Sequence, residues 1–319
     1  MTFAIRRRAG ITLIEVLVVV GIVAVLVAIL IPAVSAVRES ARRQACANNM
    51  HQIGTALNTY TTTFNVLPSG ISGKGYSVHS TMLPFLGQQS LFNSLNYQLD
   101  AAFNKGLGKA NSTAAFTSLA TFNCPSERNL GEKSFATTNY AANGGFGVLK
   151  YGFNGVFIDG TGGDSSYNMI GYHAISDGTS HTAAFTEWVL GTARKDVESG
   201  MVAVFKLPKN TVEGAYENFV QNCIDLNEFT TKQARSKPCE WVDGTYGNSI
   251  VHFAIKPNGH SCMNGNSLAF GAITANSYHS GGVNTLFLDG HISLIPSSIN
   301  ASSWRALSTR SGAEVVDDF

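Results

Sequence analysis

Residues 6–15 read Arg-Arg-Arg-Ala-Gly-Ile-Thr-Leu-Ile-Glu, and they lead without interruption into an apolar segment that ends at Pro32. The 21 residues from Ile11 to Ile31 carry one charge, on Glu15. A helix that rises ~1.5 Å per residue is roughly 32 Å long over this stretch, which is close to the thickness of the hydrocarbon core of a bilayer. The sequence therefore predicts a transmembrane helix over residues 11–31.

Three arginines, at positions 6–8, directly precede this helix. By the positive-inside rule they lie on the cytoplasmic side, so the rest of the chain should lie across the membrane. Anchoring alone does not explain Glu15, because a carboxylate in a membrane helix costs a few kcal/mol and tends to mark a function or a partner. We therefore expect Glu15 to have a role of its own.

This N-terminus resembles those of type IV prepilins and type II secretion pseudopilins, in which a short basic leader ends in Gly and is followed by Phe-Thr-Leu-Ile-Glu. Gly10 and the segment Thr12–Glu15 match that pattern, with Ile11 where the family usually has Phe. The resemblance implies a leader at residues 1–10, cleavage by a prepilin peptidase between Gly10 and Ile11, and methylation of the new N-terminus. It also implies assembly with other pilin-like subunits, in which an N-terminal amine and Glu15 lower each other's cost in lipid.

Two other interpretations of the apolar segment remain open. A secretory signal has the same basic and apolar regions, and Val34-Ser35-Ala36 would serve as its cleavage site. Against a signal, the segment exceeds the ~7–15 apolar residues that are usual there, and a signal has no use for Glu15. The second interpretation is an uncleaved signal anchor.

The composition and the cysteines narrow the class of protein further. The chain has 319 residues with a formal net charge of +1, and 13% of its residues are charged. The sequence has no basic stripe that would suit nucleic acid, so we expect no nucleic-acid partner. A body in an oxidising compartment favours disulfides over metal ligation. Because the number of cysteines is odd, at least one thiol is left over or pairs between chains, and the sequence leaves open the connectivity of Cys46, Cys124, Cys223, Cys239 and Cys262.

The helical pattern continues beyond Pro32, with apolar residues at three- and four-residue spacings from Val34 to Phe64. We predict one long helix from Ile11 to about Thr62. Its first half crosses lipid, and its amphipathic continuation at residues 32–65 packs against a globular domain. The charged residues at positions 39, 42 and 43 are interpreted as its solvated face.

Residues 66–319 show short apolar runs separated by Gly, Asn and Pro, which predicts a β-rich globular domain. One short helix is expected at Met82–Leu95, with strands at 155–158 and 183–185. Residues 193–265 are less regular and are interpreted as a possible insertion. The predicted fold class is α+β: a long N-terminal helix, transmembrane and then amphipathic, packed on an enlarged antiparallel β domain in a pilin-like arrangement.

The clearest local signal in the domain is a hairpin near the C-terminus. Asp289-Gly290 lies between two apolar runs, and this dipeptide is typical of a type I′ turn with positive φ at both residues. His279 lies ten residues before Asp289. A histidine near a hairpin base more often fixes a loop through hydrogen bonds than binds a metal. We therefore expect a structural role for His279, Asp289 and Gly290.

The His-x9-Asp-Gly spacing resembles the C-terminal signature of the DUF1559 group of bacterial prepilin-like proteins. Further segments agree with that group in the same order along the chain: 46–49, 52–54, 122–126, 139–140, 175–180 leading to Glu187, and 257–262. His181 and Thr186 depart from the pattern, which usually has Asn and Gly there. The resemblance implies an architecture more than an activity.

The sequence has no zinc-protease, nucleophile-elbow, phosphate-loop or Rossmann motif, so we expect no enzymatic activity, no cofactor and no metal site. We predict a pilin-like structural subunit that crosses the bacterial inner membrane once, with its body periplasmic or extracytoplasmic. After processing it would assemble into a pilus or a type II secretion-like pseudopilus. Its partners would be prepilin peptidase, other pilin-like subunits and inner-membrane lipid. Two alternatives stay open: a membrane-tethered module that binds a glycan or protein without polymerising, and a metallohydrolase.

Overall fold

The computed structural model describes residues 12–128, 135–146, 154–157, 170–191, 200–209, 216–228, 230–231 and 233–313. The predicted processing residues Gly10 and Ile11 lie outside these ranges.

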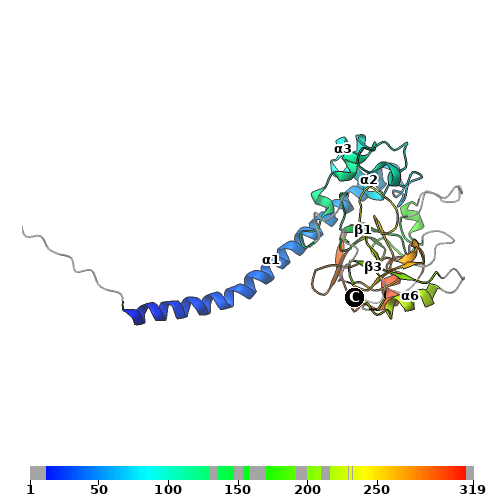
Figure 1. Ribbon diagram of the computed structural model, residues 1–319. Helices are drawn as coiled ribbons and strands as arrows, with labels where there is room; N and C mark the ends of the chain where they lie inside the picture. The colour runs from blue at the N-terminus through cyan, green and yellow to red at the C-terminus, as the bar shows by residue number, and fades with distance from the viewer. Residues whose placement is uncertain are drawn as a thin grey trace, which may run out of the picture.

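A single helix, α1 (Leu13–Phe64), forms the N-terminal part of the described chain and has 52 residues. Thr12 caps its N-terminus, and Asn65, in the left-handed conformation, ends it. The helix runs through Pro32, so the prediction of one long helix is confirmed. In Figure 1 its first half extends well away from the domain, and only its C-terminal part lies against it.

The two halves of α1 differ in burial. The large apolar side chains from Leu13 to Val37 are all exposed, whereas burial begins at Cys46 and continues through Ile53 and Leu57. The predicted packing stripe is therefore right from Cys46 to Tyr60, and it is wrong for Phe64, which is 53% exposed. It is also wrong for Val34 and Val37, which are 51% and 68% exposed because the helix has already left the domain at that point.

The described part of the domain contains two sheets. The first has five strands, in the order β5 (Ile250–Val251), β1 (Tyr140–Asn143), β2 (Ala183–Glu187), β8 (Gly282–Phe287) and β9 (Ile292–Pro296). The second has four, in the order β4 (Gln233–Ser236), β3 (Ala203–Leu207), β6 (Ser261–Asn264) and β7 (Ser267–Ala272). Most neighbours are antiparallel, and the pairs β1–β5 and β3–β6 are parallel. The predicted α+β class, with a long helix on a largely antiparallel domain, is confirmed.

Short helices cover the rest of the domain: α2 (Val78–Met82), η1 (Leu83–Leu86), α3 (Gln89–Asn93), α4 (Ala101–Asn104), α5 (Ser112–Phe116), η2 (Ala120–Phe122), η3 (Tyr172–Ala174), α6 (Tyr216–Ile224) and α7 (Ala301–Ala306). The single helix predicted at Met82–Leu95 is wrong. The chain turns at Gly87, whose φ of 72° ends η1, and α3 starts afresh after it. The strand predicted at 155–158 is also absent from its described part, because residues 154–157 form bends.

The candidate insertion at 193–265 contributes to both sheets. It contains β3, β4 and β6 of the second sheet, together with α6. It also contains β5, which pairs with β1 at the edge of the first sheet. The stretch is therefore connected to the first sheet by backbone hydrogen bonds as well as by the chain.

The C-terminal part of α1 packs directly on the first sheet. Ile53 and Leu57 share one buried cluster with Phe185 of β2 and Leu286 of β8. The contact is close at Gly54, where an added Cβ would lie 2.9 Å from Leu286 Cδ1. The absence of a side chain at Gly54 thus allows the helix to approach the sheet.

The β8–β9 hairpin is present, but its turn is not the predicted type I′. The Gly290 N–H donates to the Phe287 carbonyl at 3.0 Å, and the Phe287 N–H donates to the His291 carbonyl at 2.9 Å. Gly290 has a φ of 95°, whereas Asp289 is not among the described non-glycine residues with positive φ. This is the pattern of a three-residue loop, a type I turn followed by a left-handed glycine.

Candidate functional site

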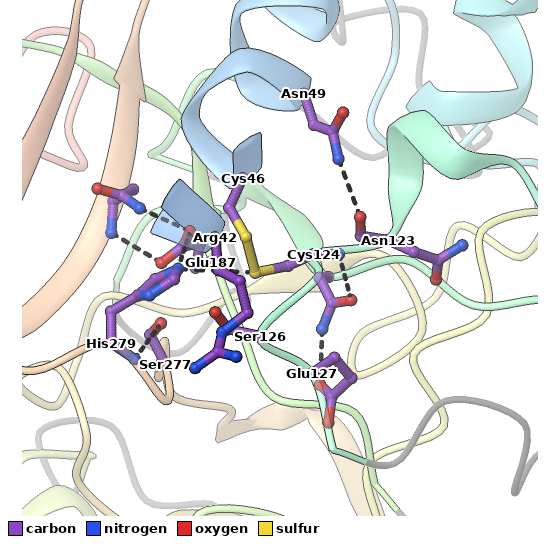
Figure 2. Close-up of a disulfide and its surroundings, with 12 residues drawn as sticks. Arg42, Cys46, Asn49, Asn123, Cys124, Ser126, Glu127, Glu187, Ser277 and His279 are labelled. Carbon is purple, nitrogen blue, oxygen red and sulfur yellow. Dashed lines mark hydrogen bonds and ion pairs between the residues drawn. A yellow bond between two sulfur atoms is a disulfide. The ribbon is translucent and has the colours of Figure 1, made fainter. Parts of the chain in front are cut away.

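Side chains from four parts of the chain meet where α1 leaves the domain. Cys46 on α1 is bonded to Cys124, which follows η2, and their Cα atoms are 4.9 Å apart. We call this bond the helix disulfide (Figure 2). Cys46 is the first fully buried residue of α1. The bond therefore fixes the long helix covalently to the domain at the point where the two separate.

The other cysteines lie elsewhere. Cys223 of α6 and Cys262 of β6 form a second disulfide, with Cα atoms 6.1 Å apart. Cys239 takes part in neither bond, and its Sγ lies 3.8 Å from the Val189 carbonyl oxygen. The sequence left this connectivity open, and the structure assigns it.

His279 lies beside the helix disulfide, between two carboxylates. Its Nδ1 is 2.9 Å from Oε1 of Glu39 on α1, and its Nε2 is 3.5 Å from Oε1 of Glu187 on β2. The same Nε2 is 3.6 Å from Cys124 Sγ. The His279 side chain is fully buried, that of Glu187 is 2% exposed, and that of Glu39 is 35% exposed. We call these residues and the helix disulfide the junction cluster: Glu39, Cys46, Cys124, Glu187 and His279.

Both carboxylates of the junction cluster have further partners. Asn284 of β8 donates to Glu187 twice, from its backbone N at 3.0 Å and from Nδ2 at 2.8 Å. Arg42, one helical turn after Glu39, donates to Oε2 of Glu39 from Nε at 2.9 Å and from Nη2 at 2.6 Å. The interpretation of Glu39 as part of a solvated face is therefore incomplete, because one carboxylate oxygen faces Arg42 on that face and the other faces the buried His279.

The ion pairs change the proton affinities at the junction. Burial alone lowers the pKa of His279, but its contacts with the carboxylates of Glu187 and Glu39 outweigh burial, so this pKa is raised above its usual value. Burial raises the pKa of Glu39, but His279 and Arg42 outweigh this effect and lower it. Both shifts favour a charged imidazolium facing Glu39.

Several short motifs of the sequence converge here. Asn49 donates to the carbonyl of Asn123 at 2.9 Å (Figure 2). The Cys124 N–H donates to Oδ1 of Asn139, also at 2.9 Å. The Tyr140 hydroxyl donates to the Cys46 carbonyl at 3.1 Å. The segments at 46–49, 122–126 and 139–140 are thus parts of one structural unit.

The two ends of the His-x9-Asp-Gly motif do not form one site. His279 precedes β8 and Asp289 follows it, and this strand of 6 residues is about 20 Å long. Asp289 accepts hydrogen bonds from the backbone N and Nδ1 of His291, at 3.0 and 2.6 Å. The motif therefore marks two structural points at opposite ends of one strand.

Asp177 and Glu187 are also separate. Asp177 accepts from the backbone N of Gly312 at 2.7 Å and of Ala313 at 2.9 Å, and so holds the chain after α7. Glu187 faces His279 instead.

Glu15 makes a local contact that our interpretation of the sequence missed. Its Oε2 accepts from the backbone N of Thr12 at 2.8 Å and from the Thr12 hydroxyl at 2.7 Å. In return the Glu15 N–H donates to Thr12 Oγ1 at 3.4 Å. This is a capping box, and the pattern Thr-x-x-Glu before an apolar run is its sequence signal. Glu15 therefore completes the N-terminal cap of α1 within its own chain.

A polar groove lies between α1 and the edge strand β9. Its volume is about 510 Å³. It is lined mainly by hydrophilic side chains of α1, with contributions from the first sheet: Ser40, Arg43, Gln44, Ala47, Asn48, His51, Asn284, Ile292 and Leu294.

Parts of the chain match known families. A prokaryotic N-terminal methylation motif matches residues 5–31, which include Gly10, Ile11 and Glu15. Within the described ranges, α1 is the one helix long and apolar enough to cross a membrane. Together these findings define a prepilin-type protein that is anchored in the membrane by a single span.

The rest of the chain identifies the family. The family described as "Protein of unknown function (DUF1559)" matches residues 35–302, which is most of the chain. The chain belongs to the DUF1559 family. Neither this family nor the methylation motif is described by an enzymatic activity. No curated protein and no solved structure matches the chain significantly.

Proposed function

We propose that this protein is a pilin-like structural subunit that is processed after Gly10 and assembles through α1 into a pilus or a type II secretion-like pseudopilus. The observation that carries the proposal is the exposed apolar half of α1. Every large apolar side chain from Leu13 to Val37 is exposed, although a domain with a substantial core lies at the other end of the same helix. Such a surface requires lipid or other helices around it.

The proposed organisation follows from this surface. Residues 1–10 form the leader, 11–31 the membrane span, 32–65 the continuation of the helix, and 66–319 the domain. Before processing, the protein spans the bacterial inner membrane once, with its body on the periplasmic side. After processing, it leaves the membrane for a fibre, at the cell surface or within the envelope.

Glu15 links membrane insertion to assembly in this proposal. Within one chain, Thr12 satisfies one carboxylate oxygen of Glu15, but the contact supplies no opposite charge. In an assembly, the N-terminal amine of a neighbouring Ile11 supplies that charge in lipid, where an unpaired carboxylate is expensive. Subunits therefore associate in the register that brings the two charges together.

Two variants separate the charge of Glu15 from its capping role. Glu15→Gln removes the charge, but glutamine at this position can still complete a capping box. Thr12→Val keeps the charge and removes the capping hydroxyl, which costs ~1 kcal/mol at the helix start. We expect Glu15→Gln to abolish the ladder of crosslinked subunits in native membranes, and Thr12→Val to retain it.

The opposite pattern would contradict the assembly role. If Glu15→Gln still gave the full crosslinked ladder while Thr12→Val lost it, Glu15 would act as a helix cap and not as an assembly charge. Immunoblots of the membrane fraction control for expression and insertion of both variants.

Processing is tested by sequencing the N-terminus of the protein purified from cells. A chain that starts at N-methylated Ile11 supports the prepilin route. A start at Val37 supports a secretory signal, and a start at Met1 or Thr2 supports an uncleaved anchor.

The polar groove favours a second candidate function, a tethered module that binds a glycan or protein without polymerising. Its lining contains the amides of Gln44 and Asn48, which suit the hydroxyl groups of a sugar. Two variants distinguish the functions. If the protein is a binding module, substitutions at Arg43 or Asn48 should abolish its binding activity. Glu15→Gln should then leave that activity unchanged.

The third sequence-based alternative, a metallohydrolase, has less support. The described residues contain one group of potential metal ligands, formed by Cys46, Cys124, Glu187 and His279. All four are buried, and a catalytic metal needs an open position for water or substrate. This arrangement therefore suits a structural role better than hydrolysis.

A further inference from the structure

The four buried ligand groups at the junction have the geometry of a closed metal site whose two sulfurs are joined. One ligand atom from each of Cys46, Cys124, Glu187 and His279 can be chosen so that all lie within 4.8 Å of one another. In a tetrahedral zinc site, Zn–S of ~2.3 Å and Zn–N of ~2.0–2.1 Å place neighbouring ligand atoms roughly 3.3–3.8 Å apart. His279 Nε2 already lies 3.6 Å from Cys124 Sγ and 3.5 Å from Glu187 Oε1.

The orientation of His279 is that of a metal ligand with a supporting partner. A ligating imidazole usually donates its other ring N–H to a carboxylate or carbonyl, which fixes the ring and leaves one nitrogen for the ion. Here Nδ1 of His279 lies 2.9 Å from Glu39 Oε1, and Nε2 points to the sulfur and to Glu187. Glu39 would therefore serve as a positioning residue.

The oxygen ligand, Glu187, is also held in place by a neighbouring residue. Glu187 is held by two hydrogen bonds from Asn284, at 3.0 and 2.8 Å. A small cavity of about 10 Å³ adjoins Cys124 and Glu187, and Ser126 and Ser277 also line it. The ligands are thus fixed in place, while the space beside them is not entirely filled by side chains.

We propose that the reduced protein binds one thiophilic divalent cation, Zn²⁺, at the junction, and that this ion and the helix disulfide exclude each other. The ligands are the thiolates of the helix disulfide, Nε2 of His279 and a carboxylate oxygen of Glu187. They come from α1, the segment after η2, β2 and the segment before β8. The ion therefore joins the long helix to the domain as the disulfide does. The inference goes beyond the proposed function and does not depend on assembly.

Binding of the ion requires reduction of the helix disulfide. A phosphine reductant gives two electrons to the sulfur–sulfur bond and takes the oxygen of one water molecule to become a phosphine oxide. The two protons of that water complete the thiols of Cys46 and Cys124. Binding of Zn²⁺ then releases both thiol protons and any proton on Nε2 of His279. Reoxidation by a small-molecule disulfide closes the helix disulfide by two thiol–disulfide exchanges, in which the reagent takes the two electrons and leaves as two thiolates, and the ion is expelled.

The test uses the full chain in detergent, reduced with a phosphine under anaerobic conditions and given Zn²⁺ alone. After gel filtration we expect one zinc per reduced chain and none per oxidised chain. Co²⁺ in place of Zn²⁺ should give thiolate-to-cobalt charge transfer and the visible bands of a tetrahedral ion. Replacing both cysteines of the helix disulfide with serine should abolish these bands.

The chain offers a matched control in its second disulfide, Cys223–Cys262. Replacing those two cysteines with serine should leave the one-to-one stoichiometry and the cobalt bands unchanged. Glu39→Gln, which alters only the positioning residue, should weaken zinc affinity by about 10–100-fold in competition with a chelator.

Several results would overturn the proposal. One is the absence of stoichiometric zinc on the reduced wild-type chain. Another is zinc binding that survives replacement of Cys46 and Cys124, because such binding would be adventitious. If that double variant fails to fold, Glu187→Gln decides, since it keeps both cysteines and the approximate shape of the side chain. Unchanged zinc affinity in Glu187→Gln would remove Glu187 from the site and refute the arrangement.

Discussion

Replacing His279 with glutamine should destabilise the oxidised protein, and more strongly at mildly acidic than at alkaline pH. Glutamine can keep one hydrogen bond at this position, but it cannot carry the positive charge that faces Glu39 and Glu187. The substitution leaves Glu187, which is 2% exposed, without its cation. It therefore acts mainly through an unpaired buried carboxylate.

The magnitude follows from the burial of the two pairs. Removing one partner of a buried ion pair costs about 3–5 kcal/mol. Glu187 retains both hydrogen bonds from Asn284, so we expect the lower end, about 3 kcal/mol. The Glu39 side chain is 35% exposed and also pairs with Arg42, so its share falls in the ~0–1 kcal/mol range of surface pairs.

The direction of the pH dependence follows from the raised pKa of His279. A raised folded-state pKa gives stability that is fully present below the unfolded value, ~6.5 for histidine, and is lost as pH rises through the folded value. The lowered pKa of Glu39 gives stability that is lost as pH falls below about 4.5. The difference between wild type and variant should therefore be largest near pH ~5.5 and smaller at pH ~8.5.

Tryptophan fluorescence during urea unfolding measures this difference. Trp188, Trp241 and Trp304 are all buried in the domain, so the signal reports the domain and not the detergent-embedded helix. The buffer contains a chelator and no reductant, so that the helix disulfide is closed and no metal contributes. His291→Gln is the control, because His291 pairs with Asp289 at 2.6 Å but is 44% exposed, and it should cost less than ~1 kcal/mol. An equal loss for His279→Gln at both pH values would refute the charged pair and leave a neutral hydrogen bond.

Three further predictions concern the disulfides, the hairpin and the leader. The sequence separations of the two disulfides are 78 and 39. From loop-closure entropy, the helix disulfide should contribute about 4.5 kcal/mol to the free energy of unfolding and the second disulfide about 3.9 kcal/mol. Equal melting temperatures with and without reductant would contradict both values. Gly290→Val should cost at least ~2 kcal/mol by denaturant titration, because a β-branched residue resists the φ of 95°, and a loss below ~0.5 kcal/mol would argue against this turn. Gly10→Phe should leave the leader attached, seen as an unprocessed mass of the purified protein, and loss of the first ten residues would show cleavage without Gly10.

The sequence was most informative where structure depends on neighbouring residues. The helix from Leu13 to Phe64 follows from a continuous apolar pattern, and its predicted limits differ from the observed ones by two residues at each end. The hairpin at Asp289-Gly290 was also correct, because the dipeptide itself favours a turn. The turn type was not, since the Leu288 and Asp289 N–H groups donate to Thr182 and Thr179, contacts that no local pattern contains.

The junction cluster could not be predicted from local sequence patterns, because its members are distant in the chain. Glu39 and His279 are 240 residues apart, and Cys46 and Cys124 are 78 apart. The charge pattern on α1 placed Glu39 on a solvated face, and it does contact Arg42 there. Only the fold shows that its other oxygen faces a buried imidazole.

The position of the junction cluster bears on the proposed assembly. The exposed half of α1 is fixed to the domain at one end, and in the proposed fibre its orientation relative to the domain would set where the domain lies. Residues beyond Cys46 are held by ordinary packing, as at Gly54 against Leu286. Glu39 lies about two helical turns before Cys46, outside the fully buried part, and is bound to His279. The helix is thus held at two points along its axis, which restrains its tilt as well as its position.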